Sequence, residues 1–354
     1  MPFFFQVIAG QKKGLLYDAL RASLYVCSLF FAAIVGIRKT LYRLGLKRRY
    51  RPQAFVISIG NIVAGGTGKT PFTILLAQKL KEIPIAILTR GYKSKAESSN
   101  RPTVIDQPKA DPGDVGDEAC VLARKLPYAL IIVNKNRTQS AKLAQELGAR
   151  VLILDDGMQH LALERDLEIV VIDAENPFGY GYLLPRGLLR EPPSALLRAD
   201  LIVLNHSKGR AVEAEIRKFS SAPIIKIQMA FEGIYSASGT EQELARCKVG
   251  IFCGIGKPEA FHKLVESLGF TVVAHRFLAD HEAMGEIALE QFARECRALH
   301  AQALLCTEKD IVKLSAVQVS ILPLFWVNVQ LQITEGEAYC SLEALLKPAS
   351  SPKK

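Results

Sequence analysis

The stretch from Ser58 to Leu80 constrains the fold of this 354-residue chain most strongly, and it reads "SIGNIVAGGTGKTPFTILLAQKL". A short run of β-branched and apolar residues leads into a glycine-rich loop, and a segment with apolar residues at helical spacing follows. Strand, loop and helix in this order are the context that a phosphate-binding loop requires. The usual G-x-x-x-x-G-K-[ST] pattern needs a glycine where this chain has Val63. A glycine-rich turn without a ligand is therefore the alternative.

The residues of the loop itself favour a nucleotide site. Glycines let backbone N–H groups turn inward around a phosphate, and the following helix N-terminus adds its dipole. Lys69 would place a positive charge at the outer phosphates, and the hydroxyl of Thr70 is a suitable ligand for Mg²⁺. The altered spacing leaves this cradle intact. The predicted nucleotide-binding residues are Gly65, Gly66, Thr67, Gly68, Lys69 and Thr70.

Apolar runs of strand length alternate with helical segments along the rest of the chain. The runs occupy 54–61, 83–92, 128–133, 149–157, 167–174 and 199–206, and the alternation restarts at about Pro223. Continuous apolar strands separated by helices indicate a mostly parallel sheet that is covered on both faces. We predict an α/β fold of the P-loop NTPase type with a smaller second α/β lobe. The expected parts are an N-terminal segment 1–51, a nucleotide-binding and catalytic domain 52–222, a second lobe 223–346 and a disordered tail 347–354.

Two adjacent carboxylates follow one of these strands. The segment "RVLILDDGMQH" places Asp155 and Asp156 at its carboxyl end, the edge at which open α/β sheets bind ligands. One of them could hold Mg²⁺, directly or through water, beside the phosphate loop. Adjacent residues of a strand point to opposite faces, so the sequence does not decide between them. His160 is either a further ligand or a structural histidine.

The N-terminal segment combines apolar and basic character. Sixteen residues without a charge lie between Arg21 and Arg38, and seven Lys or Arg residues fall within positions 38–51. A helix needs about 20 apolar residues to cross a bilayer, so this one either spans at a tilt or lies in the interface. The basic cluster would then meet an anionic cytoplasmic surface. A buried core helix is the structural alternative. We predict a membrane anchor within 1–51, with the body of the protein in the cytoplasm.

Charge and cysteine content limit the class of protein further. A formal net charge of +10 indicates an anionic partner, which could be nucleic acid, acidic lipid or a phosphorylated substrate. The seven cysteines include no C-x-x-C pair, which favours reduced thiols of the kind found in cytosolic proteins. The basic cluster adjoins an apolar helix rather than a face studded with aromatic residues, so nucleic-acid binding is disfavoured.

Several segments together resemble one enzyme family. Along the chain they read "GNIVAGGTGKTP", "LTRGYKSK", "VGDEACVLA", "ILDDGMQH", "LLPRGLLREP", "CGIGKPEAF", "FLADHEAM" and "TEKDIVKL". In order from Gly60 to Leu314, they are similar to the tetraacyldisaccharide 4'-kinases, which phosphorylate a lipid A precursor in Gram-negative bacteria. The unusual spacing of the glycine-rich loop is itself a feature of that family.

The resemblance implies an activity and a set of site residues. The activity would be ATP- and Mg²⁺-dependent phosphorylation of the 4'-hydroxyl of a tetraacyldisaccharide 1-phosphate at the cytoplasmic face of the inner membrane. Asp117 and His281 would form a catalytic pair beside Lys69, the aspartate accepting the proton of the sugar hydroxyl. The implied metal shell is Thr70, Asp155, Asp156, Glu118 and Glu191, and the implied contacts to substrate or nucleotide phosphate are Arg90, Tyr92 and Arg137.

A second functional class shares the same loop. A membrane-associated P-loop NTPase switch would also need a phosphate loop and a strand-end aspartate. The segment "TEKD" at 307–310 superficially resembles a base-reading motif of GTPases, although it could equally cap a helix. It lies in the predicted second lobe, and the chain offers no obvious glycine–glutamine switch pair. The kinase is therefore the leading prediction. The sequence does not predict an oligomeric state.

Overall fold

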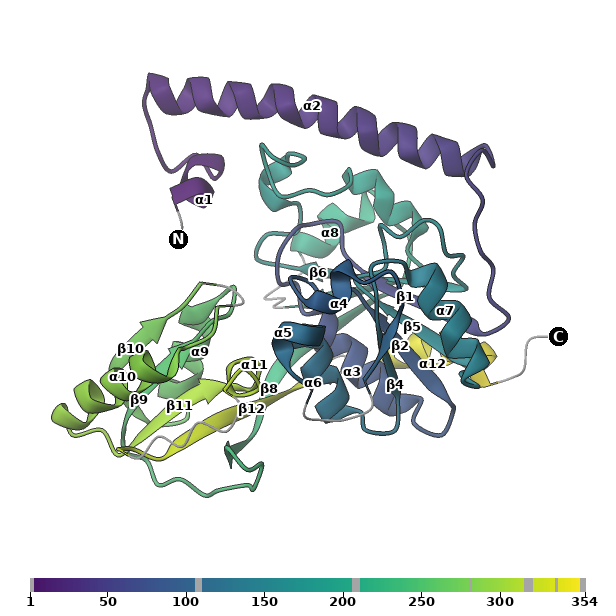
Figure 1. Cartoon of the computed structure of the whole chain (residues 1–354). Helices are drawn as coiled ribbons and strands as arrows, with labels where there is room; N and C mark the ends of the chain where they lie inside the picture. The colour runs from purple at the N-terminus through teal and green to yellow at the C-terminus, as the bar shows by residue number, and fades with distance from the viewer. Residues whose placement is uncertain are drawn as a thin grey trace.

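A single mixed sheet runs through the molecule, from the first lobe into the second (Figure 1). The structure is a computed structural model. It describes residues 3–105, 110–205, 211–279, 282–314, 321–334 and 337–350. Within these residues the twelve strands lie in the order β10-β9-β11-β12-β8-β7-β6-β1-β5-β2-β4-β3. All neighbours are parallel except β3 with β4 and β8 with β12. The predicted α/β fold is confirmed.

The first lobe holds the strand–loop–helix unit at its centre. Its strands are β1 (Phe55–Gly60), β2 (Ile85–Thr89), β3 (Thr103–Val104), β4 (Leu130–Val133), β5 (Val151–Asp155), β6 (Leu167–Asp173) and β7 (Leu201–Asn205). Its helices are α3 (Lys69–Lys79), α4 (Lys95–Ser98), α5 (Pro112–Val115), α6 (Asp117–Lys125), α7 (Arg137–Glu146) and α8 (Ala211–Arg217), with short 3-10 turns at Gly179–Gly181 and Pro193–Arg198.

Alternate residues of the central strand face opposite layers of helices. Ile57 and Ile59 of β1 share a buried cluster with Phe72 of α3. Val56, one residue before Ile57, belongs to a second cluster with Ala141 of α7. A strand buried on both faces needs apolar residues at every position, which explains why the run 54–60 shows no polar alternation. The carboxyl ends of β1, β5, β6 and β7 consequently meet at one edge of the sheet.

A long antiparallel ribbon joins the two lobes. Strand β8 (Ile224–Ser236) pairs first with β7 and then with β12 (Leu324–Ile333). One end of the ribbon lies in the first-lobe core and the other in the second-lobe core. The second lobe adds β9 (Lys248–Cys253), α9 (Pro258–Ser267), β10 (Thr271–Phe277), α10 (Glu286–Ala298), β11 (Ala303–Thr307) and α11 (Glu308–Ile311). The ribbon therefore connects the two lobes both covalently and by strand pairing.

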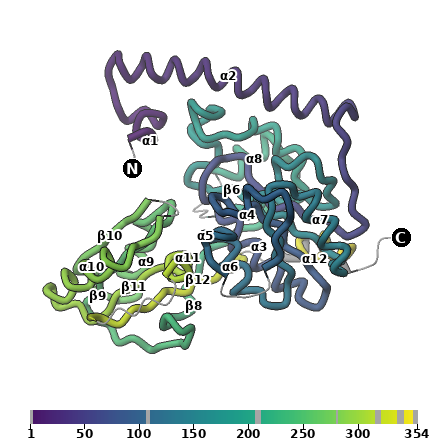
Figure 2. The backbone as a smooth tube through the Cα atoms, in the orientation of Figure 1, coloured from purple at the N-terminus to yellow at the C-terminus, as the bar shows by residue number. Residues whose placement is uncertain are grey.

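Two N-terminal helices lie outside the two lobes (Figure 2). They are α1 (Phe3–Ile8) and α2 (Leu15–Arg43). Ser28 is the one residue of α2 that is buried, whereas Phe30, Ile34 and Ile37 are more than 60% exposed. A core helix would bury its apolar residues, so the alternative of a packed core helix does not describe α2.

The C-terminal helix packs on the first lobe. Helix α12 (Glu337–Ser350) places Leu342, Leu346 and Ala349 in the same buried cluster as Phe72. The sequence instead predicts a second lobe over 223–346 and a disordered tail over 347–354, of which 351–354 lie outside the described residues. The three apolar residues are spaced by four and three positions, so they lie on one face of the helix. That face covers the first-lobe end of the ribbon. The free thiols are those of Cys27, Cys120, Cys247, Cys253, Cys296 and Cys306.

Candidate active site

The loop between β1 and α3 is held in shape by its neighbours. Gly68 has φ 95° and ψ 21°, a left-handed conformation, and a Cβ there would lie 2.8 Å from Nδ2 of Asn205. That amide donates a hydrogen bond to the carbonyl oxygen of Thr67 over 3.2 Å. Nδ2 of Asn61 donates to the hydroxyl of Thr67 over 3.1 Å. The loop is thus held by amide side chains at the ends of β1 and β7.

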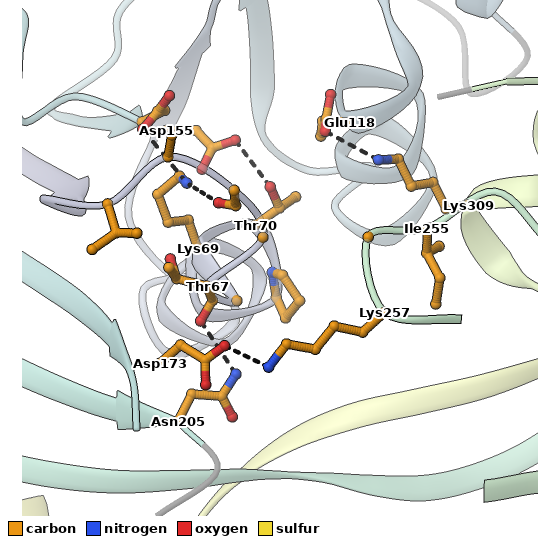
Figure 3. A pocket seen from close by; sticks show the side chains of 18 of the residues that line it. Thr67, Lys69, Thr70, Glu118, Asp155, Asp173, Asn205, Ile255, Lys257 and Lys309 are labelled. Carbon is orange, nitrogen blue, oxygen red and sulfur yellow. Dashed lines mark hydrogen bonds and ion pairs between the residues drawn. The ribbon is translucent and has the colours of Figure 1, made fainter. Parts of the chain in front are cut away.

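Lys69 stands over the loop, where a phosphate would be bound (Figure 3). Its ammonium lies 3.4 Å from the carbonyl oxygen of Gly65 and 3.6 Å from Oδ1 of Asp156. Gly65 has φ 118°, and a Cβ at Gly65 or Gly66 would meet open space. The cradle is therefore spacious, with one positive charge at its mouth. This arrangement suits the outer phosphates of a nucleotide.

Asp155 faces the first turn of α3. It accepts hydrogen bonds from the hydroxyls of Thr70, at 3.2 Å, and Thr73, at 3.1 Å. Burial, reinforced by the neighbouring charge of Asp156, raises the pKa of Asp155 to about 6. Asp155 thus ties the phosphate loop to the adjacent strand.

Asp156 turns the other way, into the open cleft. Its φ of 54° ends the strand, so the rule that neighbours alternate between faces does not apply to it. Nη1 of Arg190 lies 2.9 Å from both of its carboxylate oxygens. Burial opposes its ionisation, but the charges of Lys69 and Arg190 outweigh burial and lower the pKa of Asp156. Asp156 is consequently an ionised carboxylate at the mouth of the loop.

Glu191, predicted in the metal shell, lies in a network of cations. It is buried and accepts hydrogen bonds from Arg198 at 2.9 and 3.0 Å and from Gln159 at 3.0 Å. Lys39 of α2 forms an ion pair with it at 2.5 Å. These positive charges lower the pKa of Glu191 despite its burial. Its recorded contacts weigh against metal ligation and instead connect α2 to the cleft through Gln159, which also contacts Arg190.

Asp117 and Glu118 open helix α6. Gly116 precedes them at φ 94°, and a Cβ there would lie 3.1 Å from Cα of Gly91. Each acidic side chain meets a lysine of the second lobe: Lys313 lies 3.4 Å from Oδ2 of Asp117, and Lys309 lies 3.4 Å from Oε1 of Glu118. His281, the predicted partner of Asp117, lies outside the described residues.

The remaining predicted contacts also line the cleft. Arg90, Tyr92, Arg137 and His160 all do so. Arg137 is buried and donates to the carbonyl oxygens of Asn134 and Asp155. Burial lowers its pKa to about 10. Burial and then the charge of Arg137 lower the pKa of His160 to about 4, so this imidazole is neutral at pH 7.

The segment 307–310 stabilises the second lobe. The hydroxyl of Thr307 donates to Oδ2 of Asp310 at 2.5 Å, and the backbone N–H of Gly254 donates to Oδ1 at 2.9 Å. Asp310 is almost fully buried. Thr307 is the N-cap residue of α11, but its hydroxyl binds the Asp310 side chain and makes no capping bond to a backbone N–H, so the segment has a structural role other than side-chain capping.

One large cleft of about 2850 Å³ contains the phosphate loop and extends to helix α2. Its lining includes Lys69 and Asp156 at one place and Phe31, Ile34 and Val35 of α2 at another. A smaller cavity of about 330 Å³ is lined by Asp117 and Lys313 and shares Tyr92 and Lys93 with the cleft.

Two of the cleft residues that were not anticipated from the sequence join separate elements of the site. Lys257 reaches from the second lobe to Oδ2 of Asp173 and Oε2 of Glu175, both at 2.6 Å (Figure 3). Asn205, which fixes the loop, is the other. Two features of the sequence could have pointed to these residues. Asp173 and Asn205 end parallel strands, where ligands bind, and Lys257 lies in the segment "CGIGKPEAF".

The site fits a nucleotide with its metal ion. Mg²⁺ favours hydroxyl, carboxylate and phosphate oxygens and seldom occupies an all-protein cage. Among the residues that the structure describes, no group of three or more His, Cys, Asp or Glu side chains could hold a metal by itself. Thr70 and Asp156 nevertheless flank the loop, so bound phosphate would complete an oxygen shell.

Helix α2 is long and apolar enough to cross a membrane. It has 29 residues, with a mean hydropathy of 1.9 in its most apolar window, and 6% of that window is buried. Two contacts hold its basic end against the body: Arg38 donates to the carbonyl oxygen of Gln159 over 3.0 Å, and Lys39 pairs with Glu191. The helix therefore presents apolar side chains outward beside the cleft.

Comparison with known proteins gives a consistent result. The family model described as tetraacyldisaccharide-1-P 4'-kinase matches residues 20–347. The tetraacyldisaccharide 4'-kinase of Syntrophus aciditrophicus is 36% identical over 341 residues, covering 89% of this chain and 90% of that protein. The enzyme of that name from Chlamydia pneumoniae is 34% identical over 305 residues, covering 84% and 83%.

A solved structure extends the similarity to the fold. The crystal structure of LpxK from Aquifex aeolicus in complex with ATP matches with a TM-score of 0.76 and 30% identity. The match covers 93% of this chain and 99% of that one. The predicted resemblance is confirmed, and the chain belongs to the tetraacyldisaccharide-1-P 4'-kinase family.

Proposed function

We propose that this protein transfers the γ-phosphate of ATP to the 4'-hydroxyl of a tetraacyldisaccharide 1-phosphate at the cytoplasmic face of the inner membrane. The observation that carries the proposal is the continuity of one cleft from Lys69 and Asp156 to the apolar side chains of α2. A kinase for a membrane glycolipid needs a phosphate site and an apolar surface within one cavity. A switch NTPase has no such need, and family membership also disfavours it.

The residues of the first lobe bind and orient ATP. The backbone of Gly65 to Gly68 surrounds the phosphates, and Lys69 neutralises charge at the transferred group. Mg²⁺ would be held by Thr70 and Asp156, with Asp155 behind them, and would supply charge neutralisation of the phosphates. Because phosphoryl transfer needs mainly positioning and electrostatic stabilisation, these contacts suffice for the donor side.

Asp117 serves the acceptor side. It accepts the proton of the sugar hydroxyl as the phosphate is transferred, and His281 orients or strengthens it, as the family resemblance implies. Support comes from the position of Asp117 in a cavity that shares Tyr92 and Lys93 with the cleft. The N-terminus of α6 favours the ionised carboxylate that this role requires.

Helix α2 attaches the enzyme to the membrane that contains its substrate. Its exposed apolar residues bury surface in lipid, and the basic residues at 38–51 meet anionic headgroups.

Product identity tests the function. Purified protein in detergent, with Mg²⁺, is incubated with labelled ATP and tetraacyldisaccharide 1-phosphate, and the lipid product is located by tandem mass spectrometry. We expect one added phosphate on the distal sugar, and little free phosphate without acceptor. Release of free phosphate at the same rate with or without acceptor, and no phosphorylated lipid, would support the switch NTPase instead.

A further inference from the structure

The segment "TEKDIVKL" reaches from the second lobe to the predicted catalytic base. Lys313 is 4% exposed, and its ammonium lies 3.4 Å from Oδ2 of Asp117 in the first lobe. The same nitrogen lies 3.4 Å from Oδ1 of Asp310 and donates to the carbonyl oxygen of Glu282 over 3.1 Å. A nearly buried ammonium thus has two contacts in its own lobe and one across the lobe boundary.

The second-lobe contacts fix the position of that ammonium. Asp310 is 3% exposed in its side chain and is itself held by the N–H of Gly254 and the hydroxyl of Thr307. Lys313 therefore extends from a rigid support. Separating the two charges of a buried ion pair costs free energy, because each charge is then left without compensation. This lysine therefore has little freedom to move away from Asp117.

A second bridge of the same kind lies beside the first. Lys309 and Lys313 are four residues apart, and they meet Glu118 and Asp117, which are adjacent at the start of α6. Two lysines, one on α11 and one in the turn that follows it, thus meet two consecutive carboxylates across the lobe boundary. The start of α6 is in turn fixed by the close approach of Gly116 to Gly91. The ion pair with Lys313 restricts the orientation of the Asp117 side chain.

We propose that Lys313 is a positioning residue: it orients the carboxylate of Asp117, so that the base is set for catalysis when the second lobe lies against the first. This role rests on the proposed function. The small cavity lined by both side chains supports it, because the ammonium acts where an acceptor hydroxyl would meet the base. A misplacement of about 1 Å in such a group costs about a hundredfold in rate.

The test compares Lys313→Met, Lys313→Gln and Lys313→Arg in the full-length enzyme with ATP and the acceptor lipid. We expect the neutral variants to lower kcat by about 10- to 100-fold while KM for ATP changes by less than about threefold. Arginine, which keeps the charge, should restore kcat to within about fivefold of the wild type. Arg276→Met is the matched control: it breaks an ion pair with Glu295 inside the second lobe, lines neither cavity and should leave kcat near that of the wild type.

A double-mutant cycle separates positioning from structural support. If Lys313 acts through Asp117, Lys313→Met should lower the residual rate of Asp117→Ala by less than about twofold. If Lys313→Met lowers the rate of Asp117→Ala by as large a factor as it lowers the wild-type rate, the positioning role is overturned. A neutral variant of Lys313 with wild-type kcat would overturn it as well. The wild-type control tells the two proposals apart: no acceptor-dependent transfer by the wild type overturns the function, and the role of Lys313 falls with it.

Discussion

The hydroxyl of Thr70 donates a hydrogen bond to Oδ2 of Asp155 over 3.2 Å, joining the first turn of α3 to the end of β5. The neighbouring Asp156 turns away from this bond and meets Lys69 and Arg190. Two adjacent carboxylates therefore have different surroundings. Asp155 supports the phosphate loop through the hydroxyls of Thr70 and Thr73, while Asp156 lines the cleft.

Replacing Lys69 tests the phosphate loop directly. Lys69→Ala removes the positive charge between Gly65 and Asp156, and we expect kcat to fall at least about a hundredfold because the transferred phosphate loses its neutralising partner. Steady-state kinetics with labelled ATP measure the change, and thermal unfolding controls for folding. Near-normal turnover in a folded variant would rule out the assignment of this loop.

Asn205→Ala should loosen the same loop without removing a charge. The side chain is buried, and its loss leaves the carbonyl oxygen of Thr67 without this donor. We expect KM for ATP to rise about five- to tenfold and the free energy of unfolding to fall by about 1–2 kcal/mol. Kinetics at varied ATP and urea unfolding test both effects. An unchanged KM would mean that the loop keeps its shape without Asn205.

Much of this arrangement could be predicted from the sequence because it is local. Short-range sequence patterns predict the strand–loop–helix unit, the glycines at positions 65 and 68, and the lysine that follows them at position 69. Asp155 and Asp156 could be located but not oriented, since the positive φ of Asp156 ends the strand one residue earlier than alternation assumes.

Long-range contacts could not be predicted in this way. Glu191 is bound by Lys39 of α2 as well as by Arg198 and Gln159, a set of contacts that brings distant segments together, whereas the family resemblance suggests a metal ligand. The contact between Asp117 and Lys313 needs the two lobes side by side. Likewise, α12 covers the first lobe only because the ribbon of β8 and β12 returns the chain there.

The raised pKa of Asp155 predicts a pH-dependent stability. Its carboxyl binds a proton more tightly in the folded chain, so the stability from this group is fully present below pH about 4 and is lost as the pH rises through 6. The amide side chain of the Asp155→Asn variant does not bind or release a proton in this pH range. Relative to the wild type, the variant should gain up to about 3 kcal/mol in the free energy of unfolding between pH 4 and pH 7.5. Urea unfolding at the two pH values measures this, and a difference that is constant with pH would contradict it.

Polar substitutions on α2 separate membrane attachment from nucleotide binding. Phe30 and Ile37 are 69% and 62% exposed, so replacing both by serine should change stability by less than about 0.5 kcal/mol each. We expect weaker sedimentation with anionic vesicles and a higher KM for acceptor in vesicles, with KM for ATP unchanged. Ile287→Ser, at a 78% exposed position on α10, is the control and should bind vesicles as the wild type does. Equal vesicle binding by all three proteins would exclude α2 as the attachment site.

The most direct test of the account is acceptor-dependent phosphate transfer by the wild type and by Asp117→Ala, measured together with ATP binding. We expect transfer to the tetraacyldisaccharide 1-phosphate to fall by at least about a hundredfold in the variant while its affinity for ATP stays within about threefold. Transfer at the wild-type rate by Asp117→Ala would contradict a catalytic role for this residue, because the cleft would then need no base at the start of α6.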